Sequence, residues 1–498
     1  MHLRNLLKET RRDRVALIAL GCKTNQYEMD ALADSLREMS FEIVESDEAA
    51  DVYVLNTCTV TAEAERKTRQ ILRRYRREQP DALLVACGCC AERSDLSSLA
   101  DIVIGTKNRP SLPALILRAL HTKKTQGAIP EVCTKKDVGF DAYEELGAIA
   151  VPKGVRAFLK IQDGCDHHCT YCAIAPARGP ARSRKLEAIV QEARALVVRG
   201  YRELNLTGTN INLYGIGSVD QEIDRPELAA CYAGYAGHKQ DKTKRIGSCT
   251  ALGTKGAASS VAVLRTHLPD VLDALERIDG LDRIRLGSLD PTILTPEMVK
   301  RLTSYKKLCP HFHLSLQSGS DRILCKMGRK NTHQGYVDVC QRLNDAFPSV
   351  GITADIMVGF PGETEEDYQE TIELCEKVRF LRMHVFPYSR RPGTPAAEWS
   401  SQVARDVVRD RAARLRKLAS RFALEAIMAR VGKERDVLVE CLDNEGRLCG
   451  YTPEYIYVRA QRADILDTFQ EGGCNEGDIV RMRITGAKSK DACAIVVK

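Results

Sequence analysis

The stretch Ala157-Phe-Leu-Lys-Ile-Gln-Asp-Gly-Cys165-Asp-His-His-Cys169-Thr-Tyr-Cys172 joins an apolar strand pattern to three closely spaced cysteines. Further candidate strands follow it, with helical patterns between them, at Leu204–Leu206, Ile284–Leu286, Phe312–Leu316, Thr353–Val358 and Met383–Pro387. Strands that alternate with helices form parallel sheets with the helices packed outside. Residues 151–400 are therefore predicted to fold as an incomplete (β/α)6 barrel, whose chemistry belongs at the carboxyl ends of the strands.

Residues 14–117 show the same alternation on a smaller scale. Strand patterns alternate with the helical patterns Glu28–Met39 and Ala62–Glu78, and lie at Val15–Leu20, Val52–Asn56, Leu83–Ala86 and Asp101–Ile104. This order predicts a parallel α/β sheet of the Rossmann-like or flavodoxin-like kind, with binding sites at the carboxyl ends of its strands. Cys22, Cys58 and Cys89 follow three of those strands.

The remaining segments divide the chain further. Residues 118–150 lack periodicity and are interpreted as a linker, and residues 217–262, rich in Gly, Ala, Ser and Lys, as a loop insertion into the barrel. Residues 401–431 carry an apolar helical face and predict a connecting helix. Short alternating runs in residues 432–498 predict a small C-terminal β-barrel.

The composition is ordinary for a globular protein, with 44% hydrophobic and 28% charged residues in a chain of 498. No apolar run reaches the roughly 20 residues that a membrane-spanning helix needs, and the first residues lack a signal-peptide pattern. We therefore expect a cytoplasmic protein without membrane contact. In that reducing compartment 19 cysteines, an odd number, indicate metal ligation rather than disulfides.

The C-x3-C-x2-C run predicts an iron–sulfur site. Three thiolates of one short loop, Cys165, Cys169 and Cys172, can bind three corners of a [4Fe–4S] cluster and leave one iron open for a substrate. The amino and carboxylate groups of S-adenosylmethionine suit that iron, and an electron from the cluster would cleave its S–C bond to give a radical. A zinc site with His167 or His168 as the fourth ligand is the alternative.

Polar and glycine residues near the ends of the other barrel strands are candidates for binding adenosylmethionine. Glycine at such a rim lets the backbone approach a ligand closely. In chain order the candidates are Thr207, Asn210, Ser288, Gln317, Ser318, Asp355 and Gly359.

The cysteines of the N-terminal sheet predict a second cluster. Cys22, Cys58 and Cys89 come from neighbouring strand ends, and three thiolates brought together there would bind another [4Fe–4S] cluster with an open iron. Three buried cysteines without a ligand are the alternative. Cys87 and Cys90 flank Cys89, and a strand through Val85 would put Cys87 and Cys89 on one face, so geometry alone does not choose the third ligand.

Three blocks together resemble one family, the radical S-adenosylmethionine methylthiotransferases. Gly21-Cys-Lys-Thr-Asn-Gln-Tyr27 and Asn56-Thr-Cys-Thr-Val60 resemble its N-terminal cluster domain, the cysteine run leads into Ala177-Arg-Gly179 as in the family, and the end of the chain resembles its RNA-binding TRAM domain. The resemblance assigns Cys165, Cys169 and Cys172 to the radical cluster. It assigns Cys22, Cys58 and Cys89 to an auxiliary cluster, because Gly88-Cys-Cys-Ala91 matches the family's G-C-x-A. The pair His167-His168 departs from the polar and aromatic residues more usual there.

The block from Gly21 to Glu28 and the segment His384–Thr394 resemble most closely the subtype that modifies N6-threonylcarbamoyladenosine at position 37 of tRNA. The implied reaction replaces the C2–H of that base with a methylthio group: one adenosylmethionine methylates sulfur on the auxiliary cluster and another is cleaved to activate C2. The implied partners are the tRNA anticodon loop, an electron donor such as flavodoxin or ferredoxin, and a sulfur source. The alternatives are N6-isopentenyladenosine in tRNA, ribosomal protein S12, and an RNA-binding iron–sulfur redox sensor without enzymatic activity.

Basic residues gather in two places that suit an RNA backbone. Residues 66–77 contain seven Lys and Arg and no acidic residue, whereas residues 433–498 contain ten Lys and Arg against twelve Asp and Glu. A solvated helix face is the alternative for the first group. We predict tRNA contacts from both groups, at Arg73, Arg74, Arg76, Arg77, Arg481, Arg483 and Lys488.

Overall fold

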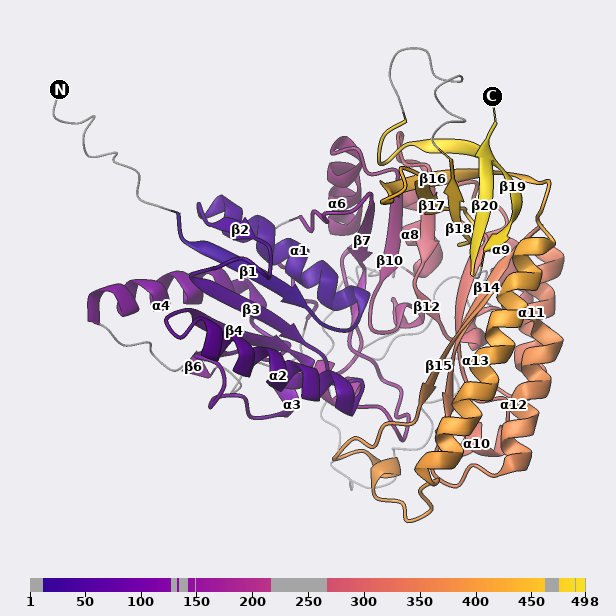
Figure 1. Cartoon of the computed structure of the whole chain (residues 1–498), viewed down its shortest axis with the longest axis horizontal. Helices are drawn as coiled ribbons and strands as arrows, with labels where there is room; N and C mark the ends of the chain where they lie inside the picture. Colours follow the sequence, from indigo (N-terminus) through magenta and orange to yellow (C-terminus); the bar gives the residue numbers. More distant parts are fainter. Residues whose placement is uncertain are drawn as a thin grey trace, which may run out of the picture.

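The computed structural model describes residues 12–126, 132–133, 142–147, 149–215, 267–461, 474–488 and 490–497. Three folded units follow one another along the chain: an N-terminal α/β sheet, a partial central barrel and a closed C-terminal barrel (Figure 1). The predicted insertion at 217–262 lies outside the described residues, as do parts of the predicted linker. Of the helices described, none has the length and apolar character that crossing a membrane requires.

The N-terminal sheet is parallel and is covered by helices on both faces. Its strand order is β2-β1-β3-β4-β5-β6, and apolar residues of α1 and α4 pack on one face while those of α2 and α3 pack on the other. The strands are β1 (Arg14–Ala19), β2 (Glu42–Val44), β3 (Val52–Thr57), β4 (Leu83–Gly88), β5 (Ile102–Val103) and β6 (Val132–Cys133); the helices are α1 (Lys23–Glu38), α2 (Ala62–Glu78), α3 (Cys89–Arg93) and α4 (Leu112–Gln126).

Two details differ from the sequence prediction. Helix α1 begins at Lys23, whereas the sequence predicted a start at Glu28. The prediction missed the first turn because that turn is polar and shows no apolar periodicity. Helix α4 continues to Gln126, so the segment predicted as an aperiodic linker from residue 118 begins as helix.

The central unit is the predicted partial barrel of parallel strands. In spatial order they are β7 (Arg156–Lys160), β10 (Glu203–Thr207), β11 (Arg283–Leu286) followed by β12 (Ser288–Leu289), β13 (His311–Gln317), β14 (Gly351–Val358) and β15 (Arg382–Pro387). The outer helices are α6 (Leu186–Val198), α8 (Leu268–Glu276), α9 (Pro296–Leu302), α11 (His333–Ala346) and α12 (Glu365–Val378). Shorter elements at the rim are β8 (Gln162–Asp163), β9 (Arg182–Ser183), α5 (Ile174–Arg178) and α10 (Asp321–Lys326), with 3-10 turns η1 to η4 at Arg109–Ser111, Ile211–Leu213, Pro291–Ile293 and Pro395–Ala397.

Alternation along the barrel strands separates an apolar outside from a polar inside. Leu204 and Leu206 of β10, and Phe312 and Leu314 of β13, join the core beneath the outer helices. The residues between them face inward. We call the space they enclose the lumen; its lining includes Arg156, Phe158, Glu203, Asn205, Arg285, His311 and His313.

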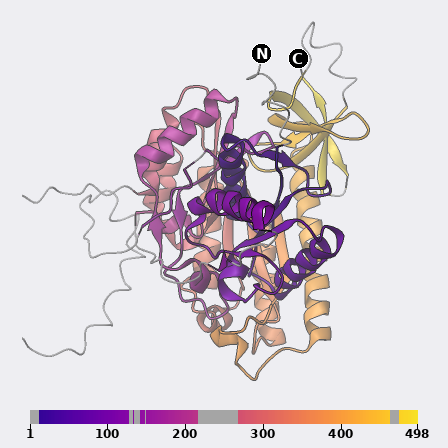
Figure 2. The same ribbon diagram turned by 90° about the vertical axis from the view of Figure 1, so that its left-hand side faces the viewer.

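The N-terminal unit lies against the open side of the barrel, next to the edge strand β7 (Figures 1 and 2). Tyr27 and Ala31 of α1 pack with Phe158 of β7 and with Ala150. The carboxyl ends of the N-terminal strands are thereby brought to the carboxyl rim of the barrel.

Helix α13 (Arg405–Met428) leads to the C-terminal unit, a closed barrel with strand order β16-β17-β18-β20-β19. Its strands are β16 (Glu434–Leu442), β17 (Leu448–Tyr451), which the sequence prediction missed, β18 (Tyr457–Ala460), β19 (Ile479–Lys488) and β20 (Asp491–Val496).

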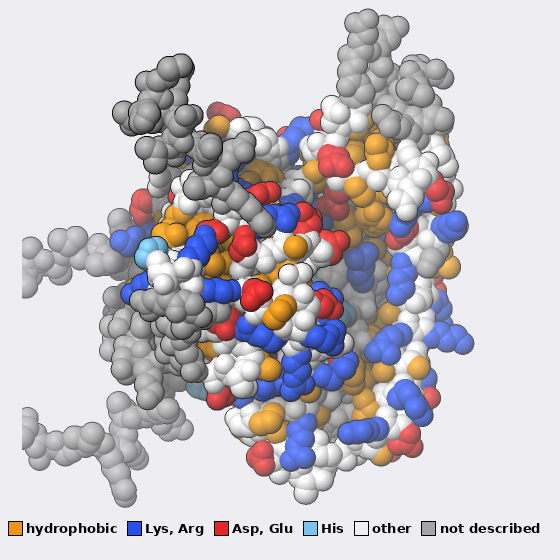
Figure 3. All heavy atoms as spheres, turned by 60° about the vertical axis from the view of Figure 1, so that its left-hand side comes forward, with side chains coloured by type: hydrophobic (Ala, Val, Ile, Leu, Met, Phe, Trp, Pro, Cys, Tyr) orange, Lys and Arg blue, Asp and Glu red, His pale blue; other side chains and the backbone are white. Residues whose placement is uncertain are grey.

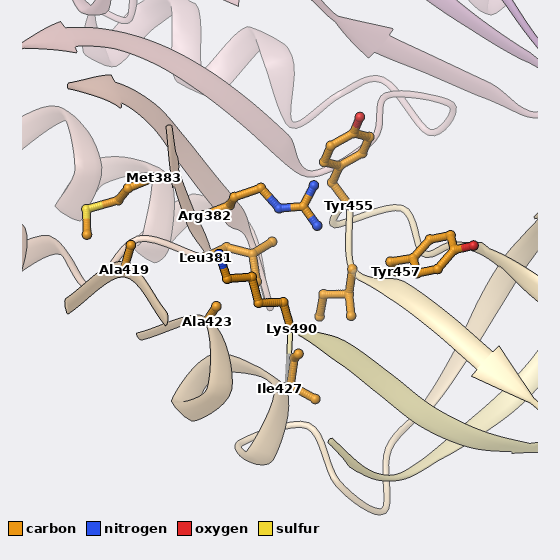
Figure 4. A pocket seen from close by; sticks show the side chains of 10 residues that line it. Leu381, Arg382, Met383, Ala419, Ala423, Ile427, Tyr455, Tyr457 and Lys490 are labelled. Atoms are coloured by element: carbon orange, nitrogen blue, oxygen red, sulfur yellow. The ribbon is translucent and has the colours of Figure 1, made fainter. Parts of the chain in front are cut away.

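The C-terminal barrel closes the floor of the central barrel. The Tyr455 ring stacks on His311 at 4.5 Å between centroids, and Arg285 donates to the Pro453 carbonyl (2.8 Å). Figure 4 shows the hollow at this seam, where Arg382 extends toward Tyr455 and its guanidinium lies 5.7 Å from the ring centroid. His311 and Arg382 are the first residues of β13 and β15, so the C-terminal unit lies at the amino ends of these strands, opposite to the cysteine loop.

Candidate active site

The C-x3-C-x2-C loop follows β7 and folds over the carboxyl rim of the barrel. Gly164 adopts a φ of +73°, and a Cβ there would overlap the Pro180 carbonyl, so the turn requires glycine. Thr170 fixes the loop to the end of α10: its N–H donates to the Met327 carbonyl (3.0 Å) and its hydroxyl to the Lys326 carbonyl (2.9 Å).

Backbone and side-chain donors surround the sulfurs of this loop. The N–H of His167 donates to Cys165 Sγ (3.4 Å), and the N–H of Ile174 donates to Cys172 Sγ (3.3 Å). Asn210 Nδ2 also donates to Cys165 Sγ (3.8 Å). Burial raises the pKa of Cys165 to about 12, and the nearby thiols of Cys172 and Cys169 act in the same direction. The three thiols are thus close enough to interact electrostatically, and a cationic centre such as iron would favour their thiolate forms.

Arg329 is a cation at this loop that sequence reasoning missed. It is buried between the loop and the lumen, where it pairs with Asp290 (3.1 Å) and donates to the Ser315 carbonyl (2.6 Å). Burial raises the pKa of Cys169, and Arg329 opposes that effect. Arg329 thus favours the thiolate form of one of the three candidate ligands.

Cys22, Cys58 and Cys89 converge at the carboxyl edge of the N-terminal sheet. Gly21 precedes Cys22 with a φ of +93°, and a Cβ on Gly21 would lie 2.5 Å from Cys58 Sγ. Gly88 precedes Cys89 with a φ of +90°. Each glycine allows the chain to turn sharply at a strand end and present the next thiol. Burial raises the pKa of Cys89 to about 12, and Cys22 and Cys58 both add to the effect.

The structure separates Cys89 from its two neighbours. Cys87 packs in the apolar core under α1 and α4; burial raises its pKa to about 12, with Glu28 as the next cause and Cys89 as the one thiol among the causes. Cys90 packs in the core on the other face of the sheet, with Ala91 and Leu96. Cys89 is therefore the residue of this run that faces Cys22 and Cys58, as the family pattern implies.

A buried charge network joins the two cysteine groups. Arg178, six residues after Cys172, donates to Asp163 Oδ1 (2.9 Å), to Glu28 Oε1 (2.9 Å) and to Asn25 Oδ1 (2.8 Å). Glu28 and Asn25 belong to the helix that begins after Cys22. Lys160 bridges the same two carboxylates, at 3.0 Å from Glu28 and 2.7 Å from Asp163.

These carboxylates are ionised despite their burial. Burial by itself would raise the pKa of Glu28, but Arg109 and Arg178 outweigh it and hold that pKa well below its usual value. Arg178 also interacts electrostatically with the thiols of Cys89 and Cys22. No sequence motif other than Ala177-Arg-Gly179 signalled this network, because its members come from four distant segments.

The candidates for adenosylmethionine binding fall into two groups. The first group lines the lumen or the rim. It includes Thr207, Ser288 and Asp355, which face the lumen, and Asn210, which donates to Cys165 Sγ. It also includes Gln317, whose buried side-chain carbonyl oxygen has no hydrogen-bond partner in the described structure. The other two have structural contacts instead. The Ser318 hydroxyl accepts from Ser320 N–H (3.2 Å), and a Cβ on Gly359 would overlap Val408 of α13.

Asp355 is held between two histidines that the sequence analysis did not single out. His313 Nε2 lies 3.3 Å and His384 Nδ1 lies 3.2 Å from its carboxylate. Burial acts to raise the pKa of Asp355, but the hydrogen bonds from the histidines outweigh it and lower the pKa.

The two predicted RNA-binding groups lie at different ends of the molecule. Helix α2 begins beside the rim, where Ala62 N–H donates to Ser389 Oγ (2.8 Å) of the segment after β15. Figure 3 shows Lys and Arg side chains dominating the lower part of one face. On α2, acidic residues pair with Arg66, Arg74, Arg76 and Arg77; Lys67 and Arg73 are exposed. On the C-terminal barrel, Arg481 and Arg483 both pair with Glu434.

Within the described ranges, no three His, Cys, Asp or Glu side chains lie close enough to hold one metal ion. A [4Fe–4S] cluster binds each thiolate at a different iron and so needs a wider spacing. Each triad brings three thiols together with N–H donors to its sulfurs, and this arrangement fits such a cluster.

Three family models match successive parts of this chain. Residues 159–375 match the model for the radical SAM superfamily, residues 14–105 match the uncharacterized protein family UPF0004, and residues 429–497 match the TRAM domain. A solved radical S-adenosylmethionine methyltransferase, TsrM from Kitasatospora setae, superposes with a TM-score of 0.48 at 15% identity, covering 77% of this chain and 75% of that one.

Two curated relatives make the assignment narrower. The chain is 33% identical to threonylcarbamoyladenosine tRNA methylthiotransferase MtaB of Bacillus subtilis, over 89% of each chain. It is 32% identical to tRNA-2-methylthio-N(6)-dimethylallyladenosine synthase of Pelotomaculum thermopropionicum, over 95% of each chain. The chain belongs to the radical SAM methylthiotransferase family and is an enzyme of that class. Membership implies adenosylmethionine and a [4Fe–4S] cluster as cofactors.

Proposed function

We propose that this enzyme converts N6-threonylcarbamoyladenosine at position 37 of tRNA to its 2-methylthio derivative. The observation that carries the proposal is the meeting of two thiol triads where the N-terminal sheet joins the barrel rim, since methylthiolation needs both a radical source and a sulfur donor. A tRNA substrate is supported by the names of both relatives and by the TRAM match.

Cys165, Cys169 and Cys172 would hold the radical cluster, and Cys22, Cys58 and Cys89 the auxiliary one. Bound there, the first would supply the electron that cleaves adenosylmethionine reductively and the second the sulfur for transfer. The chain's own residues do the positioning. Arg329 and Asn210 stabilise charge at the radical loop, and Arg178 fixes the second triad relative to the first.

Thr207, Asn210, Ser288, Gln317 and Asp355 remain our candidates for contacts to adenosylmethionine. Each places a polar group at or inside the rim beside the radical loop. Ser318 and Gly359 would contribute by shaping the backbone there rather than by direct contact.

The threonylcarbamoyl substrate is favoured over an isopentenyl one by the chemistry of the lumen. An isopentenyl group is apolar and needs an apolar pocket, whereas the threonylcarbamoyl group carries a carboxylate, a hydroxyl and urea N–H groups. Two inward residues suit such a group: Lys23, which has no carboxylate partner among the described residues, and the polar Asn205. The inward Arg156 and Arg285 are paired with Glu440 and Glu203. Ribosomal protein S12 is the remaining alternative acceptor, and the sensor alternative is set aside because the chain belongs to an enzyme family.

Helix α2 would contact the tRNA backbone near the rim through Arg73, with Arg74, Arg76 and Arg77 beside it. Arg481, Arg483 and Lys488 lie at the opposite end of the barrel strands and would reach a more distant part of the tRNA. A flavodoxin or ferredoxin would deliver electrons, and a separate sulfur source would supply sulfur for the reaction. This chemistry suits a cytoplasmic enzyme.

The experiment is nucleoside analysis of tRNA from a deletion strain, with and without the restored gene. The proposal predicts that 2-methylthio-threonylcarbamoyladenosine disappears on deletion and returns on complementation. Complementation with the Cys58→Ala variant should fail. Loss of the methylthio-isopentenyl nucleoside instead would contradict the proposed substrate.

A further inference from the structure

One lysine extends from the auxiliary thiols into the barrel. Lys23 follows Cys22 directly, and its Nζ lies 5.9 Å from the centroid of the Phe158 ring on β7. Its side chain is solvent-accessible, yet it interacts electrostatically with Tyr455, Arg156, Arg285 and Glu203, which lie on the lumen floor. Lys23 thus belongs to the N-terminal unit, but its side chain lies at the interior of the central barrel.

Lys23 has no carboxylate partner among the described residues. The acidic groups that face this part of the lumen are already paired: Glu203 with Arg285 (2.7 Å) and Arg283 (3.5 Å), Glu440 with Arg156, and Asp355 with His313 and His384. The ammonium of Lys23 is therefore available for an anion from outside, because the acidic side chains of the described floor are already paired with arginines.

A second polar group lies at the same level of the barrel. Asn205 of β10 pairs in register with Phe158, the residue beneath Lys23. Its side chain is buried, with 3% exposed, and its carbonyl oxygen has no hydrogen-bond partner in the described structure. An orphaned buried amide costs free energy unless a ligand satisfies it. Lys23 offers a charged donor and Asn205 an acceptor, which together match a substituent with a carboxylate and an N–H or hydroxyl.

We infer that Lys23 and Asn205 form the subsite that recognises the N6 substituent of the substrate base, with Lys23 binding its carboxylate. This inference rests on the proposed function and names its specificity-determining residues. Because Lys23 adjoins Cys22, the same helix start that presents an auxiliary thiol also selects the base placed between the two triads. An apolar N6 substituent would leave Lys23 and Asn205 without partners.

The test uses reconstituted enzyme and three anticodon stem-loop RNAs that differ only at position 37: threonylcarbamoyladenosine, isopentenyladenosine and unmodified adenosine. Affinities are measured by fluorescence anisotropy, product formation by mass spectrometry, and iron content by colorimetry. The variants are Lys23→Gln, Lys23→Arg and Asn205→Ala. Lys300→Gln, an exposed lysine on α9, is the matched control.

We expect Lys23→Gln to weaken binding of the threonylcarbamoyl RNA by about 10- to 100-fold, the range for loss of a charge-assisted hydrogen bond. Its affinity for unmodified RNA and its iron content should not change. Lys23→Arg should restore most of the loss, and Asn205→Ala should lower the same preference by about 3- to 10-fold.

Lys23→Gln within two-fold of wild type on the threonylcarbamoyl RNA would overturn the inference. If Lys23→Gln lost iron, Asn205→Ala would decide, since Asn205 lies on strand β10 and not in either cysteine loop. An unchanged preference in that variant would equally overturn the inference. Should the wild-type enzyme itself fail to prefer the threonylcarbamoyl RNA, the proposed function fails rather than the subsite alone.

Discussion

Replacement of Arg178 by Met should loosen the contact between the N-terminal sheet and the barrel. Arg178 is 1% exposed and donates hydrogen bonds to Asp163, Glu28 and Asn25 at 2.8–2.9 Å. Met retains most of the side-chain volume but provides neither charge nor donors. Two buried carboxylates then lose one of their shared cations.

The size of the effect depends on the cations that still contact the two carboxylates in the variant. Removing one partner of a buried ion pair costs about 3–5 kcal/mol. Lys160 and Arg109 still contact both carboxylates, so we expect the lower end of that range, about 3 kcal/mol. At about 1.4 kcal/mol per factor of ten, the opening equilibrium of α1 against the barrel rises by about 100-fold.

The assay is amide hydrogen exchange of the peptides that cover α1 and β7, followed by mass spectrometry on anaerobic protein. Arg178→Lys keeps a charge and should show a smaller effect. Arg194→Met, at an exposed arginine on α6, should show none. Exchange in Arg178→Met within about five-fold of wild type would refute the role given to this network.

Three further predictions follow from the site and its surroundings. Lys67→Gln with Arg73→Gln should reduce the slope of log affinity for tRNA against log salt by about 1.4–1.8, at about 0.7–0.9 per lost phosphate contact. The matched pair Arg74→Gln and Arg77→Gln, whose charges are shared with Glu78, should reduce it less, and equal slopes would contradict the assignment. Gly21→Ala should halve the iron content, because its Cβ would lie 2.5 Å from Cys58 Sγ at a φ of +93°. Full iron content in this variant would show that the site of Cys22, Cys58 and Cys89 tolerates a side chain at position 21. Burial raises the pKa of Asp30 from 3.8 to about 6, so the folded state binds the proton more tightly than the unfolded state. The protonated carboxyl therefore stabilises the fold below pH 4, and this contribution, at most about 3 kcal/mol, is lost as the pH rises through 6. Asp30→Asn should therefore raise the melting temperature at pH 8 and not at pH 4, and an equal shift at both values would count against this.

The strands could be read from the sequence because each is a local signal. The runs ending near Lys160, Thr207 and Val358 alternate strongly, and all appear as barrel strands. The family pattern assigned the ligand role to Cys89, and that assignment stays a prediction. In the structure, Cys87 packs in the core under α1, whereas Cys89 begins α3 and interacts electrostatically with the other two thiols.

The contacts between units could not be read in this way. Lys23 and Phe158 are far apart in sequence, and nothing in either segment signals that one helix closes the barrel whose strand carries the other. Arg178 illustrates the same limit, because its partners Glu28 and Asp163 look like ordinary surface acids until the fold buries them. The sequence also overestimated the free positive charge of residues 66–77, because Glu63, Glu78 and Asp101 form ion pairs with some of these arginines.

Iron stoichiometry of anaerobically reconstituted cysteine variants tests the central claim most directly. We predict about eight iron atoms per chain in the wild type, about four in the Cys22→Ala, Cys58→Ala, Cys89→Ala triple variant, and about eight in Cys87→Ala. The triple variant should still convert adenosylmethionine to 5′-deoxyadenosine when reduced. A triple variant that kept all its iron, or a Cys87→Ala variant that lost half, would contradict the assignment of the second cluster to these three thiols.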